Sequence, residues 1–234
     1  KLSANTKEPA MKWQEKSFDQ KIVNSIANAT NLSPFLAKLL AERNIESIAD
    51  AEAFISPKLA NLNDPFDIKN MDRAVGRIKD AIKKKEEILL VGDYDVDGIS
   101  SVSILQKVLS ELGVVSSLII PRRKDEGYGL TMNVLKRGLG KRDISLVIAL
   151  DCGTNSIEEA IFLKDSGIDL IVVDHHQAKE DISDFPIILN PHLFDSPDAP
   201  WVNLCTAGLA FKLAHAIVKS IRIEGSKIAE RIDL

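Results

Sequence analysis

Short apolar runs interrupt the polar pattern in the middle of the chain, and three of them end directly on an aspartate. These aspartates are Asp93, Asp151 and Asp174. Continuous runs of Val, Ile and Leu are typical of parallel strands that are buried on both faces of a sheet. The carboxyl ends of parallel strands meet at one edge of an open sheet, so we expect the three aspartates to converge on one crevice.

Around these runs the pattern alternates between strands and helices. The expected strands lie near residues 88–92, 115–120, 146–150, 169–173 and 186–189. The expected helices lie near residues 99–111, 131–139, 155–166 and 205–232. This alternation predicts an α/β fold with a doubly wound, mostly parallel sheet and right-handed crossovers.

The first 70 residues follow a helical pattern with small loops and carry no chemical motif. Ser33 before Pro34 marks one helix start, because Ser is a preferred N-cap and Pro is favoured at the first helical position. The segment 63–66 breaks the pattern as a turn. We therefore expect a small helical N-terminal extension over residues 1–70 and an α/β domain over residues 71–234.

Composition and charge set limits rather than define a function. The chain is 45 % apolar and 27 % charged with a net charge of −4, which is ordinary for a globular protein and gives no bulk attraction to nucleic acid. No apolar run approaches the roughly 18 residues of a membrane span, and the N-terminal segment lacks the apolar core of a signal peptide. We therefore expect a cytoplasmic protein, with Cys152 and Cys205 as buried reduced thiols.

The sharpest local signal is a loop with aspartates at alternate positions, Asp93, Asp95 and Asp97, between a strand and a helix. A calcium-loop frame fails here, because no frame that starts at Asp93 combines a glycine at its sixth position with the glutamate that must end it. His175 and His176 directly follow the aspartate that ends another strand. Clustered carboxylates repel one another unless cations neutralise them, so five aspartates and two histidines at one edge predict a metal cluster.

Three further side chains are candidate contacts for a phosphorylated substrate. Arg123 offers a planar guanidinium for phosphate oxygens, and Tyr128 offers a ring for base stacking. An exposed loop without a binding role is the alternative for these two residues. His192 follows the last expected strand and also points toward the crevice, as a metal ligand or a phosphate contact.

The motifs resemble those of a known superfamily. The first three motifs of the DHH phosphoesterases are matched by residues 93–98, 151–153 and 174–176. Features of the RecJ branch, the single-strand-specific DNA exonucleases, are matched by residues 63–66, 71–75, 120–123, 126–130 and 206–212. The resemblance covers nearly all of the chain from about residue 33 onward.

This resemblance implies a nuclease that uses two Mn²⁺ or Mg²⁺ ions to remove nucleotides from the 5′ end of single-stranded DNA, in DNA repair or recombination. The implied metal ligands are Asp95, Asp97, Asp151 and His175. Asp93 would be a further or outer ligand, His176 would face the scissile phosphate and assist the leaving oxygen, and Arg123 would hold a phosphate. Single-stranded DNA is the implied partner, together with unidentified repair or replication proteins.

The chain departs from the family pattern at its end. The fourth motif of the family is another aspartate that comes soon after an Asp-Leu pair, and the last two residues here are Asp233 and Leu234. We therefore expect a DHH domain that is cut before its fourth motif, and that binds metal but is weak or inactive as an exonuclease by itself.

Two alternatives remain. One is a DHH phosphoesterase that acts on short oligonucleotides or cyclic dinucleotides, although such enzymes tend to begin close to the first motif and a long segment precedes Asp93 here. The other is a non-catalytic nucleic-acid-binding replication factor, whose signature would be lost ligands. All three motifs are intact in this sequence.

Overall fold

The computed structural model describes residues 17–179, 185–225 and 232 of the protein, and its contacts divide the chain between Leu62 and Asn63. Each of the two units holds a hydrophobic core of its own. None of the helices in these residues is long and apolar enough to cross a membrane.

Three short helices form the first unit. They are α1 (Gln20–Thr30), α2 (Pro34–Ala41) and α3 (Ile48–Ile55), followed by the short 3-10 helix η1 (Leu59–Asn61). The expected helix start at Ser33 is confirmed, because its hydroxyl accepts a hydrogen bond of 3.3 Å from the Leu36 N–H. The core of the unit draws on all three helices and contains Val23, Ile26, Ala37, Leu40, Ala41 and Ala51.

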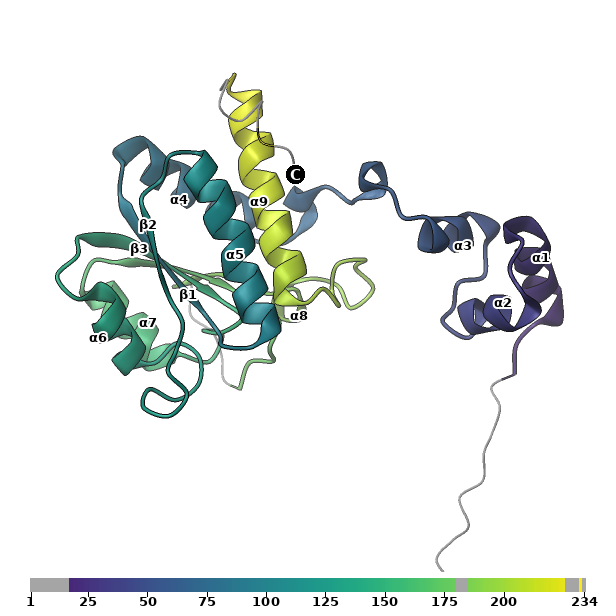
Figure 1. Cartoon of the computed structure of the whole chain (residues 1–234), viewed down its shortest axis with the longest axis horizontal. Coiled ribbons are helices and arrows are strands. Elements are labelled where there is room, and N and C mark those ends of the chain that lie inside the picture. The colour runs from purple at the N-terminus through teal and green to yellow at the C-terminus, as the bar shows by residue number, and fades with distance from the viewer. Residues whose placement is uncertain (1–16, 180–184, 226–231, 233–234) are drawn as a thin grey trace, which may run out of the picture. The chain divides into compact units, whose positions relative to one another are not determined.

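A five-stranded sheet forms the centre of the second unit (Figure 1). Its strands are β1 (Glu87–Gly92), β2 (Ser116–Ile119), β3 (Ile144–Leu150), β4 (Asp169–Val173) and β5 (Ile187–Leu189). The spatial order is β2-β1-β3-β4-β5 and all neighbouring pairs are parallel, so the five expected strands and the parallel sheet are confirmed. In this doubly wound order the direction of winding reverses between β1 and β3, where ligands bind in such folds.

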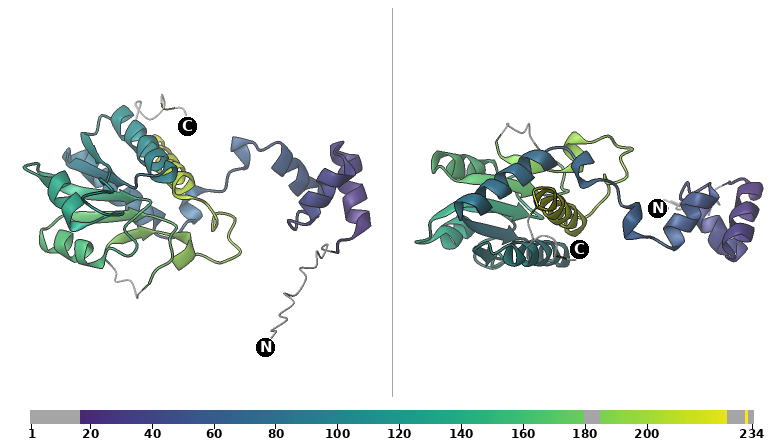
Figure 2. Two further views of the ribbon diagram at one scale, coloured as in Figure 1. Left: turned by 60° about the horizontal axis from the view of Figure 1, so that its bottom comes forward. Right: turned by 90° about the horizontal axis from the view of Figure 1, so that it is seen from above.

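Helices cover both faces of the sheet, as the doubly wound prediction requires (Figures 1 and 2). One face packs against α4 (Met71–Lys84), α5 (Val96–Glu111) and α9 (Thr206–Ile223), of which α5 and α9 lie side by side. The other face packs against α6 (Met132–Leu139) and α7 (Ile157–Asp165). The short elements η2 (Pro65–Asp67) and α8 (Pro191–Phe194) complete the unit.

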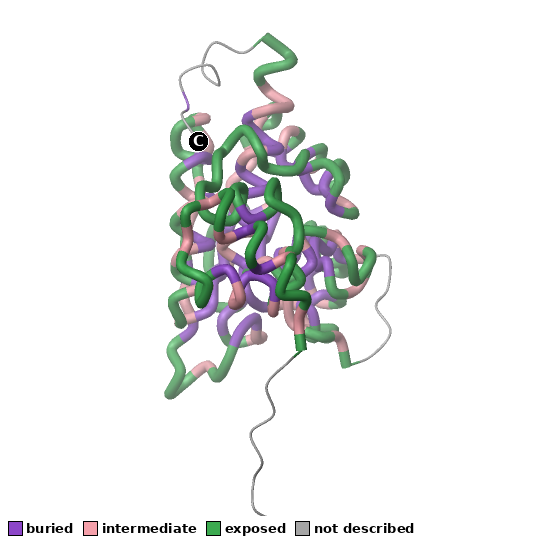
Figure 3. Tube along the Cα trace, turned by 90° about the vertical axis from the view of Figure 1, so that its right-hand side faces the viewer, coloured by how far each residue is buried: buried purple, intermediate pink, exposed green. Residues whose placement is uncertain are grey.

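Successive residues of β1 point to opposite faces of the sheet. Ile88 and Leu90 belong to the core formed with α4, α5 and α9, whereas Leu89 and Val91 belong to the core formed with α6 and α7. Burial on both faces explains why this strand is continuously apolar. Figure 3 shows buried, intermediate and exposed positions interspersed along the trace, and in α9 no residue from Thr206 to Ile221 is exposed.

Residues 63–70 pack with the second unit, although the sequence pattern predicts an N-terminal extension that runs to residue 70. Lys212 in α9 donates a hydrogen bond of 2.6 Å to the Asn63 carbonyl. Asn70 donates one of 2.9 Å to the Ile188 carbonyl in β5. These long-range contacts tie the segment before α4 to the sheet.

The last helix is shorter than expected. α9 ends at Ile223 because Gly225 takes a left-handed conformation, with φ 81°, and its N–H bonds to the Arg222 carbonyl. The remaining stretch that was expected to be helical, residues 226–231, lies outside the described residues. So do Asp233 and Leu234, on which the expectation of a domain cut before its fourth motif rests.

Candidate metal centre

The three aspartates that end the apolar runs lie in register along one edge of the sheet. The Asp93 N–H donates to the Leu150 carbonyl at 3.3 Å, which ties the end of β1 to the end of β3. The N–H of Asp151 donates to the last residue of β4 at 2.9 Å, and that of Asp174 to the last residue of β5 at 3.0 Å. Each aspartate is therefore fixed by the neighbouring strand, and the expected convergence is confirmed.

The loop after β1 turns sharply into α5. Asp95 caps this helix, since its carboxylate accepts a hydrogen bond of 2.9 Å from the Gly98 N–H. A Cβ atom at Gly98 would come within 2.6 Å of the Asp93 nitrogen, so only glycine fits there. The hydrogen bond from Gly98 also holds the pKa of Asp95 below its usual range.

Asp151 is the most perturbed acid of the cluster. It is 1 % exposed and adopts a left-handed backbone conformation with φ 64°. Burial, followed by the negative charges of Asp97 and Asp95, raises the pKa of Asp151 to about 7, although a hydrogen bond from Thr206 acts in the opposite direction. A carboxylate in such surroundings is stabilised by any cation that binds beside it.

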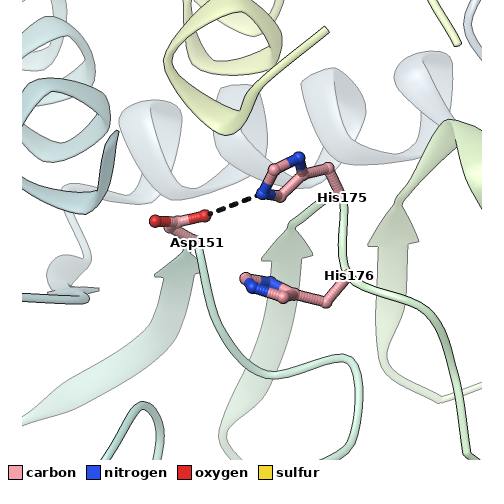
Figure 4. A group of neighbouring side chains, drawn as sticks. All are labelled: Asp151, His175 and His176. Carbon is pink, nitrogen blue, oxygen red and sulfur yellow. Dashed lines mark ion pairs between the residues drawn. The ribbon is translucent and has the colours of Figure 1, made fainter. Parts of the chain in front are cut away.

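Two sets of donor atoms share Asp151. One set joins Asp151 to Asp93 and Asp95, and the other joins it to His175 and His176, with the ligand atoms of each set within 4.8 Å of one another. Figure 4 shows both imidazoles beside the Asp151 carboxylate, and His175 Nε2 lies 3.6 Å from Asp151 Oδ1. The arrangement offers two adjacent cation positions with Asp151 as the common ligand.

Asp93 supplies an independent sign that a cation fits here. Both of its carboxylate oxygens are buried, and neither has a hydrogen-bond partner among the described residues. An unpaired buried charge is costly unless a counter-ion neutralises it. Carboxylate oxygens with one or two imidazoles suit Mn²⁺, and sites rich in carboxylate oxygen suit Mg²⁺, so the donor chemistry fits the expected ions.

The structure gives Asp97 contacts that the sequence did not predict. Its two carboxylate oxygens accept hydrogen bonds from the Thr206 N–H, at 2.8 Å, and the Ala207 N–H, at 2.7 Å. Asp97 thereby caps α9 across the site and belongs to neither donor set. It still faces the centre, because His175 Nε2 lies 3.8 Å from Asp97 Oδ2.

His176 is held by Asp174. The Asp174 carboxylate accepts a 2.6 Å hydrogen bond from His176 Nδ1, and also bonds from the N–H groups of His175 and Thr154. The bond to Asp174 raises the pKa of His176 to about 9, against the effect of burial. Burial alone would raise the pKa of Asp174, but the bonds from His176 and Thr154 lower it. The pair is therefore ionised at neutral pH, with His176 Nε2 left for another partner.

Asn190, directly after β5, supports the loop that carries His176. Its amide donates to the His176 carbonyl at 2.8 Å and to the Thr154 hydroxyl at 3.2 Å. His192, which was expected to point at the crevice, is exposed on α8, and its own N–H bonds to the Asn190 side chain. In the described part of the chain no hydrogen bond or ion pair joins the His192 imidazole to the acidic cluster.

Tyr94 connects the acidic loop to the loop that carries Arg123 and Tyr128. Its ring meets the Tyr128 ring edge-on, with centroids 5.8 Å apart, and the Arg123 guanidinium lies 5.2 Å from its centroid. Tyr128 is 56 % exposed. Lost solvation and the charge of Asp93 raise the pKa of its phenol to about 12. The only sequence signal for Tyr94 is its position next to Asp93.

Glu126 fixes the other side of this loop. Its carboxylate accepts hydrogen bonds from the Arg137 guanidinium and from the Arg122 N–H, the latter at 2.8 Å. Arg137 also donates to the Ile120 carbonyl at 2.8 Å. The bonds from Arg137 and Arg122 lower the pKa of Glu126 to about 2, so Glu126 and Arg137 form an ion pair at neutral pH. Arg123 and Tyr128 therefore belong to a braced loop.

The thiols differ from the expectation at one position. Both cysteines are free, and Cys152 is buried directly after Asp151 as expected. Cys205 is exposed, because it is the residue before α9 and lies outside the packed part of that helix.

Residues 87–233 match the family model of the DHH family, N-terminal domain. The chain therefore belongs to the DHH family, and the resemblance to the RecJ branch is confirmed by its curated relatives. It is 36 % identical to the single-stranded-DNA-specific exonuclease RecJ of Bacillus subtilis over 89 % of this chain and 26 % of that relative. It is 29 % identical to RecJ of Haemophilus influenzae over 88 % of this chain and 35 % of that relative. The chain thus spans a quarter to about a third of these relatives.

Solved structures show the same fold. A crystal structure of exonuclease RecJ bound to manganese matches with a TM-score of 0.60 and 29 % identity, over 69 % of this chain and 42 % of that one. RecJ of Thermus thermophilus in complex with Mn²⁺ matches with a TM-score of 0.68 and 24 % identity, over 87 % of this chain and 28 % of that one. The second likeness supports the fold alone.

Proposed function

We propose that this chain is the DHH part of a nuclease that uses Mn²⁺ or Mg²⁺ to remove nucleotides from the 5′ end of single-stranded DNA. The observation that carries the proposal is the pair of donor sets that share Asp151. The buried, unpaired carboxylate of Asp93 supports it further. So do the relatives, which are single-stranded-DNA-specific exonucleases, one of them in a manganese-bound structure.

The proposed ligands are those that the two donor sets contain, with Asp97 in addition. They are Asp93, Asp95, Asp97, Asp151 and His175; His176 belongs to one donor set but is left out, because its imidazole is proposed to act on the phosphate. Each carboxylate oxygen has a second lone pair, so capping α9 does not remove Asp97 from this set. A pair of divalent ions at such a site supplies a water of lowered pKa and a clamp on the attacking and leaving oxygens.

His176 is proposed to act on the phosphate rather than to deprotonate water. Its Nδ1–H is committed to Asp174, and the bond to this carboxylate favours the protonated ring. In that form Nε2–H can bind a phosphate oxygen or protonate the leaving oxygen.

The proposed substrate contacts are Arg123 and Tyr128, and the Tyr94 ring packs against both of these side chains. The exposed Tyr128 ring offers a face to an unpaired base, and Arg123 offers a charged fork to a phosphate. A paired base cannot leave its stack without cost, so such a platform favours single strands. His192 is kept as a proposed phosphate contact farther along the strand, since it is exposed beside Asn190.

We also propose that the enzyme meets single-stranded DNA in the cytoplasm. Repair or replication proteins that produce or coat such strands are its expected partners. The residues described here form no membrane-spanning helix.

Hydrolysis under single-turnover conditions tests the proposal, because enzyme in excess reveals even a slow reaction. A single-stranded oligonucleotide with a 5′ label and Mn²⁺ should release labelled mononucleotide first, whereas a 3′ label should remain on progressively shorter strands. Asp151→Ala should abolish both the release of labelled mononucleotide and the shortening of the 3′-labelled strand. Release from the 3′ end first, or hydrolysis that Asp151→Ala leaves unchanged, would contradict the proposal.

A further inference from the structure

The start of α9 forms one wall of the metal centre. Its N-cap residue, Cys205, makes no side-chain capping hydrogen bond. The free N–H groups of Thr206 and Ala207 bond instead to Asp97, which lies 109 residues before Thr206 in the sequence. This long-range cap places the first side chain of α9 directly against the acidic cluster.

Thr206 uses this position to touch Asp151. Its hydroxyl donates a hydrogen bond of 2.8 Å to Asp151 Oδ1, and the residue is 0 % exposed. The two ends of the contact are therefore fixed independently. Thr206 is fixed by the cap from Asp97, and Asp151 by its N–H bond to the end of β4.

We infer that Thr206 is a positioning residue that sets the orientation of the Asp151 carboxylate for both cation positions. The inference rests on the proposed function, since it concerns the ligand that the two donor sets share. A hydroxyl bond to Oδ1 fixes the plane of the carboxylate and occupies one lone pair, so Oδ2 and the remaining lone pair of Oδ1 point in defined directions. A small rotation of this shared ligand would move it relative to both sets at once.

The residue type suits this role. A β-branched side chain has few χ1 rotamers in a helix, so Thr holds its hydroxyl in place better than Ser does. The site is buried, and water therefore has no access through which to replace the lost donor when the hydroxyl is removed. Val has nearly the same shape as Thr, so Thr206→Val removes the donor with little change in volume.

Mn²⁺ titration by calorimetry of the parent chain and of Thr206→Val, Thr206→Ala and Thr206→Ser tests the inference. Loss of a side chain that orients a metal ligand typically weakens metal binding by about 10–100-fold, and we expect this for Val and Ala. Thr206→Ser keeps the hydroxyl, so its Mn²⁺ affinity should stay within about threefold of that of the parent. Under single-turnover conditions Thr206→Val should raise the Mn²⁺ concentration that gives half-maximal hydrolysis by a similar factor. The hydrolysis rate at saturating Mn²⁺ should change less.

Ser101→Ala is the matched control. Ser101 is also fully buried, and its hydroxyl bonds to a backbone carbonyl, that of Asp97, rather than to a carboxylate of the cluster. Its loss should lower the melting temperature without weakening Mn²⁺ binding. The inference is wrong if the parent, Thr206→Val and Thr206→Ala bind Mn²⁺ with equal affinity. It is also wrong if Thr206→Ser binds Mn²⁺ as weakly as Thr206→Val does. If the parent shows no saturable binding, the proposed function itself fails.

Discussion

Asp174 Oδ1 and His176 Nδ1 lie 2.6 Å apart, and this bond separates two residues that look alike in sequence. His175 and His176 are adjacent, and both backbone N–H groups bond to Asp174, but only the His176 imidazole is hydrogen-bonded to this buried carboxylate. Asp174 belongs to neither donor set, so its negative charge serves the imidazole rather than a cation. The same bond leaves His176 Nε2 as the free, charged end of the pair.

Asp174→Asn should therefore reduce turnover more than it reduces metal binding. The amide is nearly isosteric, but it cannot stabilise the imidazolium as a carboxylate does. We expect a loss of about 10–100-fold in the single-turnover rate, in line with other residues that orient an active-site histidine. Mn²⁺ affinity measured in parallel should change less than the rate. A rate within twofold of the parent would show that the bond has no role in hydrolysis.

Asp93 and Asp97 should respond to substitution in opposite ways in the metal-free protein. The carboxylate oxygens of Asp93 are buried without a hydrogen-bond partner among the described residues, so Asp93→Asn should raise the free energy of unfolding by about 1 kcal/mol. Asp97 caps α9 through two N–H groups, so Asp97→Ala should lower it by about 1 kcal/mol. Urea unfolding in the presence of a chelator measures both values. Equal destabilisation by the two variants would contradict the different roles.

Glu126 should give the chain a pH-dependent part of its stability. Its pKa is lowered from 4.5 to about 2 by Arg137, so the folded state favours the ionised form. The stabilisation is then fully present above about pH 4.5 and is lost as the pH falls from there toward 2. In Glu126→Gln the difference in urea midpoint from the parent should be largest near pH 6 and should shrink at pH 3. A difference in urea midpoint that stays constant over this pH range would contradict a stabilising role for the ionised Glu126 carboxylate.

The loop that Glu126 holds should bind single strands by stacking and by charge. Base stacking on an aromatic side chain contributes about 1–3 kcal/mol, so Tyr128→Leu should weaken binding of a single-stranded oligonucleotide by roughly tenfold. Arg123→Gln should flatten the dependence of log Kd on log salt by about one phosphate contact. Fluorescence anisotropy in Ca²⁺ or chelator separates binding from hydrolysis. Lys85→Gln, at the end of α4 and before the first residue of β1, is the control and should leave the salt slope unchanged.

Most of the fold could be predicted because its signals are local. The continuously apolar strand β1 is buried on both faces, and its last residue leads directly into Asp93, so strand and site were visible together. The end of α9 was placed too far along because a single glycine, Gly225, stops the helix within an otherwise helical pattern.

The parts of the site that the sequence did not reveal depend on contacts between distant residues. Asp97 meets the start of α9 across 109 residues, and Thr206 meets Asp151 across 55. Both contacts depend on how α5 packs against α9, which no periodicity in the sequence specifies. The role of His192 stays a prediction, because following a strand does not fix the direction of a side chain on a short helix.

We propose that Asp151 is common to two cation positions, and Mn²⁺ titration of Asp151→Ala by calorimetry is the decisive experiment. The parent should show saturable binding, and loss of the shared ligand should weaken binding at both positions by more than about tenfold. Asp80→Ala, which removes an exposed carboxylate on α4, should bind as the parent does. Binding of Mn²⁺ to Asp151→Ala with the stoichiometry and affinity of the parent would show that Asp151 is not a shared ligand.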